Sequence, residues 1–309
     1  MHKTDQALAI RALKNAAPYI RLYKGRTFVV KAGGGVFGDI ASTRALIEQI
    51  GILHYFGVRV VMVHGGGPQL TEISESLGVE TRMVQGRRVT DERAIEVTAM
   101  VLNGLINTRI LAICRELSID AVGVSGVDAA LVRAHRRPPV RLEEIGETVD
   151  FGLVGDIDGI DPTVIRKLLD NGLMPVVSPL SADANGVLLN INADTVAAEL
   201  AAALGAEKLI LCTGEHGILE RLDDPGSLIS YTDLAGLERL RREGRIADGM
   251  LPKAKAIENA IRGGVKRVHV VSYKAPEGIL GEVFTNEGTG TLIVADVNAL
   301  SAAEQQASG

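Results

Sequence analysis

Two glycine clusters in this sequence follow apolar runs that have the character of buried strands. The first is KAGGG at residues 31–35 and the second is HGGGP at residues 64–68. Glycine allows the backbone to approach an anion closely, and the N–H groups of a following helix point at that anion. Neither cluster matches G-x-x-x-x-G-K-[ST], which excludes a Walker-type phosphate loop. We therefore predict phosphate-type anion binding at these two glycine clusters.

Two lysines and one aspartate have the chemistry to surround a phosphoryl group. Lys31 ends the first apolar run directly before its glycines, and Lys253 begins a helix in the segment DGMLPKAKAIENA. Lys255 competes for the same role, but Lys253 is nearer the helix N-terminus and so better placed to face a phosphate. We predict that Asp194 accepts hydrogen bonds from Lys31 and Lys253 and holds the two like charges in position.

The segment LLNINADTVAAEL places polar side chains at alternating positions, namely Asn190, Asn192 and Asp194. Such residues lie on one side of an extended segment, so the asparagines are candidates for holding a substrate carboxylate. Asn192 or Asp194 would equally serve as the cap of the following helix. In GRRVTD, the planar guanidinium of Arg88 suits a carboxylate, whereas its neighbour Arg87 is expected to point the opposite way.

Apolar strands alternate with helices along most of the chain. We expect helices over 4–24, with an interruption near Pro18, and over 42–56, 91–116, 161–171, 192–205 and 248–263. We expect strands in TFVVKA and RVVMVH and over 121–126, 174–180, 208–214, 265–272 and 288–295, with a hairpin or irregular excursion over 141–158. This alternation is typical of an α/β protein whose mostly parallel sheet is covered on both faces. A soft boundary between two lobes is expected near residue 180.

The overall composition excludes several classes of function. The chain has 309 residues, 46% of them hydrophobic, with 35 glycines and a formal charge of −5, so no basic field favours a nucleic acid. Cys114 and Cys212 lie in apolar runs and are expected to be buried thiols. His64, His135 and His269 show no metal-ligand spacing. Without a signal peptide or an apolar run of about 18 residues, we expect a cytoplasmic enzyme with no membrane partner.

Taken together, these motifs resemble the amino-acid kinase family and, within it, the acetylglutamate kinases. The resemblance spans about residues 7–296, through PYIRLYKGRTFVVKAGGG, VVMVHGGGPQL, GRRVTD, VDFGLVGDID, NINAD, GMLPK and EGTGTLI. It implies an open αβα sandwich in which residues 26–180 bind the acyl amino acid and residues 181–309 bind ATP. It also implies ATP-dependent phosphorylation, with Mg²⁺, of the side-chain carboxylate of N-acetyl-L-glutamate in arginine biosynthesis.

The same resemblance implies roles for individual residues. Lys31 and Lys253 would touch the phosphoryl groups, and Asp194 would order the two lysines. Gly33 and Gly34 would hold the phosphates of ATP, and the acetylated substrate would be held by Gly65, Gly66, Arg88, Asn190 and Asn192. Because the accepting carboxylate is already ionised at neutral pH, no general base is required. Positioning and charge neutralisation should supply the catalysis.

Two segments depart from the pattern of these kinases. The first loop reads KAGGGVF where KYGGNAM is usual, and LCTGEHGIL has Gly214 where LTDVxGIL has an aspartate. The TG variant is similar to the kinase-like domains of bifunctional acetylglutamate synthase/kinases. The alternative interpretations are a kinase of the same fold acting on N-acetylaminoadipate, aspartate or carbamate, and a weakly catalytic arginine-sensing protein.

Residues 1–25 are expected to form a helix that a minimal kinase sandwich does not need. Its apolar stripe must be buried somewhere, either on its own subunit or on another. In arginine-inhibited acetylglutamate kinases an equivalent helix links dimers into a hexameric ring, with arginine between that helix and the C-terminal segment. The resemblance therefore implies a hexamer, a trimer of dimers, with an L-arginine site formed by Tyr19, Glu282 and Gly288. A histidine usual ahead of that region aligns with Glu277.

Overall fold

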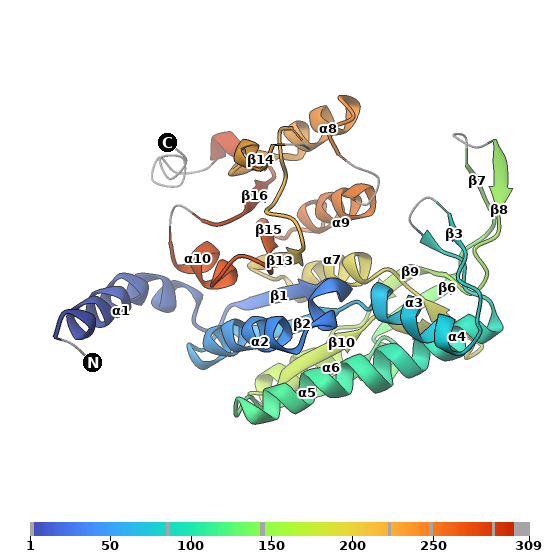
Figure 1. Cartoon of the computed structure of the whole chain (residues 1–309), viewed down its shortest axis with the longest axis horizontal. Coiled ribbons are helices and arrows are strands. Elements are labelled where there is room, and N and C mark those ends of the chain that lie inside the picture. Colours follow the sequence, from blue (N-terminus) through green and yellow to red (C-terminus); the bar gives the residue numbers. More distant parts are fainter. Residues whose placement is uncertain are drawn as a thin grey trace.

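The computed structural model describes residues 3–84, 87–142, 146–221, 224–246, 250–285 and 288–299. Within them, a central sheet of eight strands runs in the order β14-β16-β15-β13-β1-β2-β10-β5 (Figure 1). These strands are β1 Thr27–Ala32, β2 Arg59–His64, β5 Ala121–Ser125, β10 Met174–Ser178, β13 Lys208–Thr213, β14 Tyr231–Asp233, β15 Arg267–Ser272 and β16 Thr291–Val294. The pairs from β15 to β5 are parallel, whereas β16 runs antiparallel to β15. The predicted mostly parallel sheet is thus confirmed.

Helices cover both faces of this sheet. Along β1, Phe28 and Val30 pack into one buried cluster and Val29 packs into the other, because successive side chains of a strand point to opposite faces. The first cluster includes residues of α2 (Ile40–Tyr55), α5 (Asn107–Glu116) and α10 (Gly278–Phe284); the second includes residues of α6 (Thr163–Asp170), α7 (Ala193–Leu204) and α9 (Leu251–Arg262). The open αβα sandwich is therefore confirmed.

Each strand and helix predicted above is present, with ends shifted by a few residues. One detail is wrong: α1 (Lys3–Tyr23) continues through Pro18 without the predicted interruption. A second sheet, β12-β11-β6-β9, was not predicted from the sequence, and neither were the β3-β4 pair, α8 and α10. Their bounds are β3 Met83–Val84, β4 Arg87–Arg88, β6 Val132–Arg136, β9 Gly155–Ile160, β11 Leu180–Ala182, β12 Leu188–Asn190 and α8 Leu234–Arg242. These elements are short and partly exposed, so their hydrophobic period is weak.

The excursion expected over 141–158 contains a hairpin and a further strand. β7 (Val140–Leu142) pairs antiparallel with β8 (Glu147–Val149), and the chain then enters β9 of the second sheet. Figure 1 shows this hairpin standing out from the body of the molecule, beyond β3. Its place near β3 and β4 puts it on the same side as the arginines of the GRRVTD segment.

One long helix is more apolar than the sequence reasoning allowed. α4 (Glu92–Ala99) continues through a π-helical segment, Met100–Ile106, into α5. The span Glu92–Glu116 contains an 18-residue window of mean hydropathy 1.6, half of it buried inside the molecule. The expectation that no stretch would reach this length and hydropathy was therefore wrong. Packing accounts for the composition, since Ile106 and Ile110 are buried in the core that covers β2 and β10.

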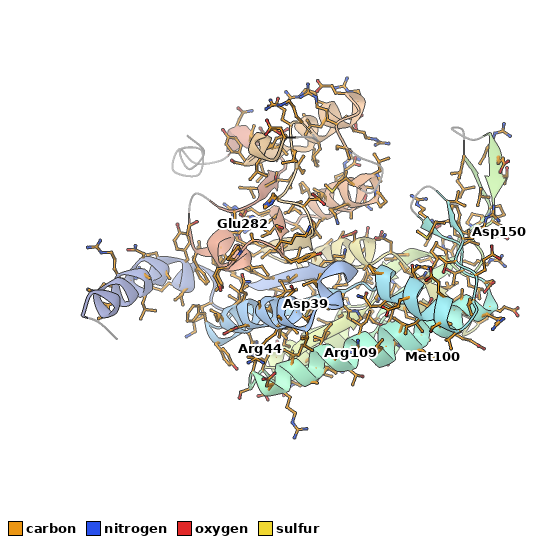
Figure 2. The ribbon with its side chains drawn as sticks, in the orientation of Figure 1. Asp39, Arg44, Met100, Arg109, Asp150 and Glu282 are labelled. Carbon is orange, nitrogen blue, oxygen red and sulfur yellow. The ribbon has the colours of Figure 1, made fainter. Side chains whose placement is uncertain are left out.

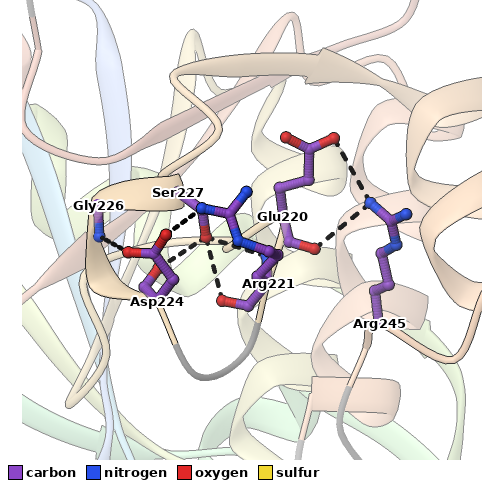
Figure 3. Close-up of polar contacts among 6 residues, drawn as sticks. All are labelled: Glu220, Arg221, Asp224, Gly226, Ser227 and Arg245. Carbon is purple, nitrogen blue, oxygen red and sulfur yellow. Dashed lines mark hydrogen bonds and ion pairs between the residues drawn. The ribbon is translucent and has the colours of Figure 1, made fainter.

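The connection between β13 and β14 includes a turn held by its own polar groups (Figure 3). The Ser227 hydroxyl accepts a hydrogen bond from the Arg221 amide at 2.9 Å and donates to the Asp224 carbonyl at 2.6 Å. Arg245, which lies before α9, reaches both the carboxylate and the carbonyl of Glu220 at 3.4 Å. These contacts tie the turn to the segment that leads into α9.

The two glycine clusters lie against each other where β1 and β2 end. Gly34 begins a 3₁₀ turn, Gly34–Gly38, and Gly67 begins α3 (Gly67–Ser76). A Cβ atom placed on Gly34 would lie 2.7 Å from Pro68 Cδ and 2.9 Å from the backbone nitrogen of Gly67. A side chain at position 34 would therefore force the two loops apart.

We expect Gly34→Ala to lower the free energy of unfolding by about 1–3 kcal/mol, the usual cost of overpacking. Gly67→Ala is the matched control, because no described atom lies within 4 Å of its Cβ position. Urea unfolding of both variants measures the difference. Equal midpoints would show that the close approach of the two loops does not constrain position 34.

Candidate active site

A cavity of about 400 Å³ opens at the C-terminal ends of β1 and β2, beside the first turns of α7 and α9. Ligands bind at this end of the strands in open α/β sheets. Most of the predicted site residues line it, namely Lys31, Gly34, Gly65, Gly66, Arg88, Asn190, Asn192 and Asp194. Gly33 and Lys253 are not among its lining residues, but Lys253 contacts Asp194, which is.

Asp194 contacts both predicted lysines. Lys31 Nζ lies 3.0 Å from Asp194 Oδ1, and Lys253 Nζ lies 3.1 Å from Oδ1 and 3.3 Å from Oδ2. All three side chains are buried. Burial raises the pKa of Asp194, but the two ammonium groups outweigh it and lower the pKa to about 2. The group therefore holds two cations and one anion, and its excess positive charge suits an anionic ligand.

The two lysines of α9 have different surroundings. Lys253 is buried against Asp194, whereas the Lys255 side chain is 63% exposed and pairs with Glu258 at 3.2 Å. Residues two apart on a helix face different directions, so only one of them can reach Asp194. Burial and the charge of Lys31 lower the pKa of Lys253, while Asp194 opposes that shift.

Asn192 is the cap of α7. Its Oδ1 accepts hydrogen bonds from the backbone N–H groups of Asp194 at 2.9 Å and Thr195 at 3.1 Å. Asp194 lies in the first turn instead, where the helix dipole favours a negative charge. Asn190 ends β12 and donates to Thr90 Oγ1 at 3.2 Å. Both asparagines also line the cavity, so capping and substrate contact are compatible for Asn192.

The glycine amides are not all available to a ligand. Gly33 N–H donates to the Cys212 carbonyl at 3.3 Å, and Gly65 N–H donates to a carbonyl of β1 at 3.0 Å. By contrast, Gly34 and Gly67 begin helical turns, where the first N–H groups have no intrahelical acceptor. The structure therefore favours Gly34 and Gly67 as anion-binding amides. Gly34 was thus among the predicted glycines, together with Gly33, whereas Gly67 was not predicted.

Three arginines line the cavity, although only Arg88 was predicted. Arg88 donates to Thr71 Oγ1 at 2.7 Å and Thr81 Oγ1 at 3.0 Å. The expectation that Arg87 points away is wrong, because β4 is only two residues long and both of them reach the rim. Arg137 arrives from the segment after β6 and forms an ion pair with Asp156 at 2.6 Å.

His64 orders the second glycine loop from beneath. It is buried, and burial lowers its pKa to about 4, so the ring is neutral. Asn107 Nδ2 lies 3.1 Å from Nε2, and Nδ1 lies 3.3 Å from the Gly65 carbonyl. The amide donor at Nε2 leaves the ring proton on Nδ1, facing that carbonyl. No group of three or more His, Cys, Asp or Glu side chains that could hold a metal occurs in the described part of the chain.

The residues predicted to bind arginine line a second cavity, of about 220 Å³. Glu282 lies on α10 beside the end of α1 (Figure 2). Gly288 has φ of +65°, and a Cβ there would lie 2.9 Å from Glu282 Oε2. The sequence reasoning missed other lining residues, among them Tyr23, Lys208, Arg267 and His269.

A row of polar contacts crosses this second cavity. His269 Nδ1 lies 2.6 Å from Glu282 Oε1, and Lys208 Nζ lies 2.9 Å from His269 Nε2. Glu282 also accepts from the backbone amides of Thr289 at 2.6 Å and Gly290 at 2.9 Å. Burial raises the pKa of Glu282, but these donors lower it to about 2, whereas burial lowers the pKa of His269 to about 4. The histidine beside Glu282 thus comes from β15 rather than from position 277.

Known proteins are similar to this chain over most of its length. The amino acid kinase family model matches residues 26–272. Acetylglutamate kinase of Myxococcus xanthus (strain DK1622) is 46% identical over 287 residues, which cover 92% of this chain and 93% of that protein. Acetylglutamate kinase of Archaeoglobus fulgidus is 42% identical over 286 residues, which cover 92% of this chain and 98% of that protein.

Solved structures show the same arrangement. N-acetylglutamate synthase from Neisseria gonorrhoeae, complexed with coenzyme A and N-acetyl-glutamate, matches with a TM-score of 0.80 and 27% identity over 93% of this chain, which spans 64% of the synthase chain. The same synthase complexed with coenzyme A and L-arginine has a TM-score of 0.80 at 26% identity, over 93% of this chain and 65% of that chain. The family model and the curated relatives, each covering most of the sequence, place this chain in the amino acid kinase family, among the acetylglutamate kinases.

Proposed function

We propose that this chain transfers the γ-phosphoryl group of ATP to the side-chain carboxylate of N-acetyl-L-glutamate, giving N-acetyl-L-glutamyl 5-phosphate in arginine biosynthesis in the cytoplasm. The observation that supports it best is the pair of buried lysines held by Asp194 beside two glycine loops. Acetylglutamate kinases covering more than nine-tenths of the chain add to that support. The alternative acceptors and the weakly catalytic sensor have no comparable support.

The geometry suits transfer to a carboxylate without a base. A γ-carboxylate is ionised at neutral pH, so the site needs only to align two anions and neutralise the charge that develops between them. Lys31 and Lys253 provide positive charge, and the amides of Gly34 and Gly67 provide donors at helical turns. Asp194 keeps the two ammonium groups together against their repulsion, so the positive charges are in place before substrates bind.

The substrate would lie on the side of the cavity formed by Arg88, Asn190 and Asn192. A guanidinium can hold the second carboxylate of N-acetyl-L-glutamate with two parallel hydrogen bonds. The β1–β13 boundary of the sheet separates the strands of residues 26–180 from those of residues 181–309. We assign the acyl amino acid to the first half and ATP to the second on that basis.

Mg²⁺ would enter with ATP rather than bind the protein beforehand. The described residues hold no cluster of metal-ligating side chains, and Asp194, the carboxylate of the cavity, is already bonded to two ammonium groups. Mg²⁺ commonly keeps several waters and binds mainly through substrate phosphates. Its contribution would be to neutralise phosphate charge.

The N-terminal helix supports a proposal of assembly and regulation. α1 projects from the body of the molecule (Figure 1), and its Ile10 and Leu13 are 58% and 59% exposed. Among the described residues, the end of α1 contacts α10, where Tyr19 packs edge-on against Phe284 at 6.5 Å. We propose that the exposed apolar stripe joins dimers into a hexamer. L-arginine would bind in the adjoining cavity, with its guanidinium at Glu282 and its carboxylate toward Lys208 and Arg267.

Asp194→Asn should retain the fold and lose about 10²–10³ in kcat, the scale for removing one preorganised charge-stabilising group. The fold should survive at reduced stability, because Asn192 still caps α7 while the two ammonium groups lose their buried counter-charge. Lys31→Ala and Lys253→Ala should fall in the same range, and Asp161→Asn, an exposed carboxylate far from the cavity, is the control. A coupled ADP-release assay with N-acetyl-L-glutamate measures all four. Turnover near that of the unmodified protein in Asp194→Asn would remove this carboxylate from the mechanism.

Arg88→Lys should raise the KM for N-acetyl-L-glutamate about tenfold or more, because lysine cannot make a two-pronged contact with a carboxylate. The KM for ATP should stay unchanged. The control is Arg109→Lys, exposed on α5 and labelled in Figure 2. If the effect falls on ATP instead, Arg88 belongs to the nucleotide side of the cavity.

Deleting residues 1–20 should convert a hexamer into dimers and abolish inhibition by millimolar arginine. Leu13→Glu should act like the deletion, since it places a charge in the exposed apolar stripe. Arg11→Glu should leave the hexamer intact, because residues two apart on a helix face different directions. Light scattering gives the mass, and the kinase assay with arginine gives the regulation. A full-length dimer, or a hexamer that survives the deletion, would refute the linking role; activity indifferent to arginine would refute the effector site.

A further inference from the structure

Three neighbouring strands bring their C-terminal ends to the first glycine loop. β1 pairs with β13 up to Ala32 and Cys212, and β13 pairs with β15 up to Thr213 and Ser272. The next residue, Tyr273, continues this pairing, because its N–H donates to the Thr213 carbonyl at 2.9 Å. One side of the sheet, at the C-terminal ends of these strands, therefore holds the loop of KAGGG and the segments at Gly214 and Tyr273.

The Tyr273 hydroxyl lies close to one glycine in each of the two segments that depart from the pattern of related kinases. A Cβ on Gly35 would lie 2.7 Å from the Tyr273 oxygen, and a Cβ on Gly214 would lie 3.4 Å from it. In the usual patterns KYGGNAM and LTDVxGIL these positions have asparagine and aspartate. Because neither glycine has a side chain, the phenol of Tyr273 occupies the space between them. The two departures from the usual pattern therefore meet at one side chain.

Lys274 extends into the same space. Its ammonium nitrogen lies 3.6 Å from the Cβ position of Gly214. The side chain is exposed, its backbone N–H bonds to Ser272 Oγ at 3.3 Å, and its ammonium has no ion pair within the part of the chain that the structure describes. An ammonium in this place adds a positive charge where related kinases have a negative one. The C-terminal strand ends beside the first loop are therefore more favourable to an anion than they would be with an aspartate at position 214.

We propose that the Tyr273 hydroxyl and the Lys274 ammonium bind the polyphosphate of ATP. This inference rests on the proposed function, in which the first glycine loop holds phosphate. Lys31, the lysine proposed to contact the phosphoryl group, lies close to this loop, since its Nζ is 3.8 Å from the Cβ position of Gly33. The phenol donates one hydrogen bond, and the ammonium neutralises charge on the terminal phosphates.

Nucleotide binding without the acceptor tests the proposal directly. ATP and AMP, each with Mg²⁺, are titrated into the full chain by calorimetry. Lys274→Met should weaken ATP binding about tenfold and Tyr273→Phe about threefold to fivefold, within the usual range for hydrogen bonds to charged and neutral groups. AMP binding should not change, because AMP lacks the terminal phosphates.

The controls are Lys167→Met on α6 and Tyr55→Phe on α2, both exposed and away from the C-terminal ends of the strands. In the kinase assay, the KM for ATP should rise in Tyr273→Phe and Lys274→Met, and the KM for N-acetyl-L-glutamate should stay the same. Variants that bind ATP like their controls would overturn the inference, as would variants that lose AMP and ATP affinity equally.

The two proposals fail in different ways. If the unmodified chain binds ATP and phosphorylates N-acetyl-L-glutamate while both variants match their controls, the inference fails and the function stands. If the unmodified chain binds ATP but does not phosphorylate this acceptor, the function fails, and the loss of ATP affinity in Lys274→Met still supports the phosphate contact. If the unmodified chain binds no ATP, both fail together.

Discussion

The contact of Asp194 with Lys31 and Lys253 is the constraint on which the rest of the site depends. It joins the end of β1, the first turn of α7 and the first turn of α9, three elements far apart in sequence. A buried carboxylate between two ammonium groups is stable only if both partners stay in place, because removing one leaves an uncompensated buried charge at a cost of about 3–5 kcal/mol. The packing of α7 against α9 and β1 is therefore tied to the positive charge that we propose binds phosphate.

The glycine loops impose a second constraint, which is steric. Gly34 touches the backbone of the second loop, Gly35 touches Tyr273, and Gly66 lies against Leu102 and Ile106. Leu102 and Ile106 belong to the π-helical segment, a form of helix often found at functional sites. At Gly34 and Gly66 the cavity wall therefore leaves no room for a Cβ, whereas Gly67 has open space there.

The two cavities lie toward opposite ends of the parallel strands of the main sheet. Lys208 and Arg267 begin β13 and β15 and line the proposed arginine site, whereas these strands end at Thr213 and Ser272, next to the first glycine loop. His269 and Glu282 connect β15 to α10, and α10 contacts α1. Lys208, Arg267 and His269 therefore connect the cavity beside α1 to two strands that end next to the first glycine loop.

The sequence by itself determined the main sheet, most of its covering helices and the identity of the lysines and aspartate, because long apolar strands, glycine clusters and helix starts are local patterns. Only the tertiary structure decided which groups are available. The Gly33 N–H is bonded to a carbonyl of β13, and Arg87 lines the cavity although it was expected to point away. The histidine beside Glu282 is His269 of β15. Short edge strands, hydrogen bonds across the sheet and contacts between distant loops have no periodic signature, since each depends on residues that meet only after the chain has folded.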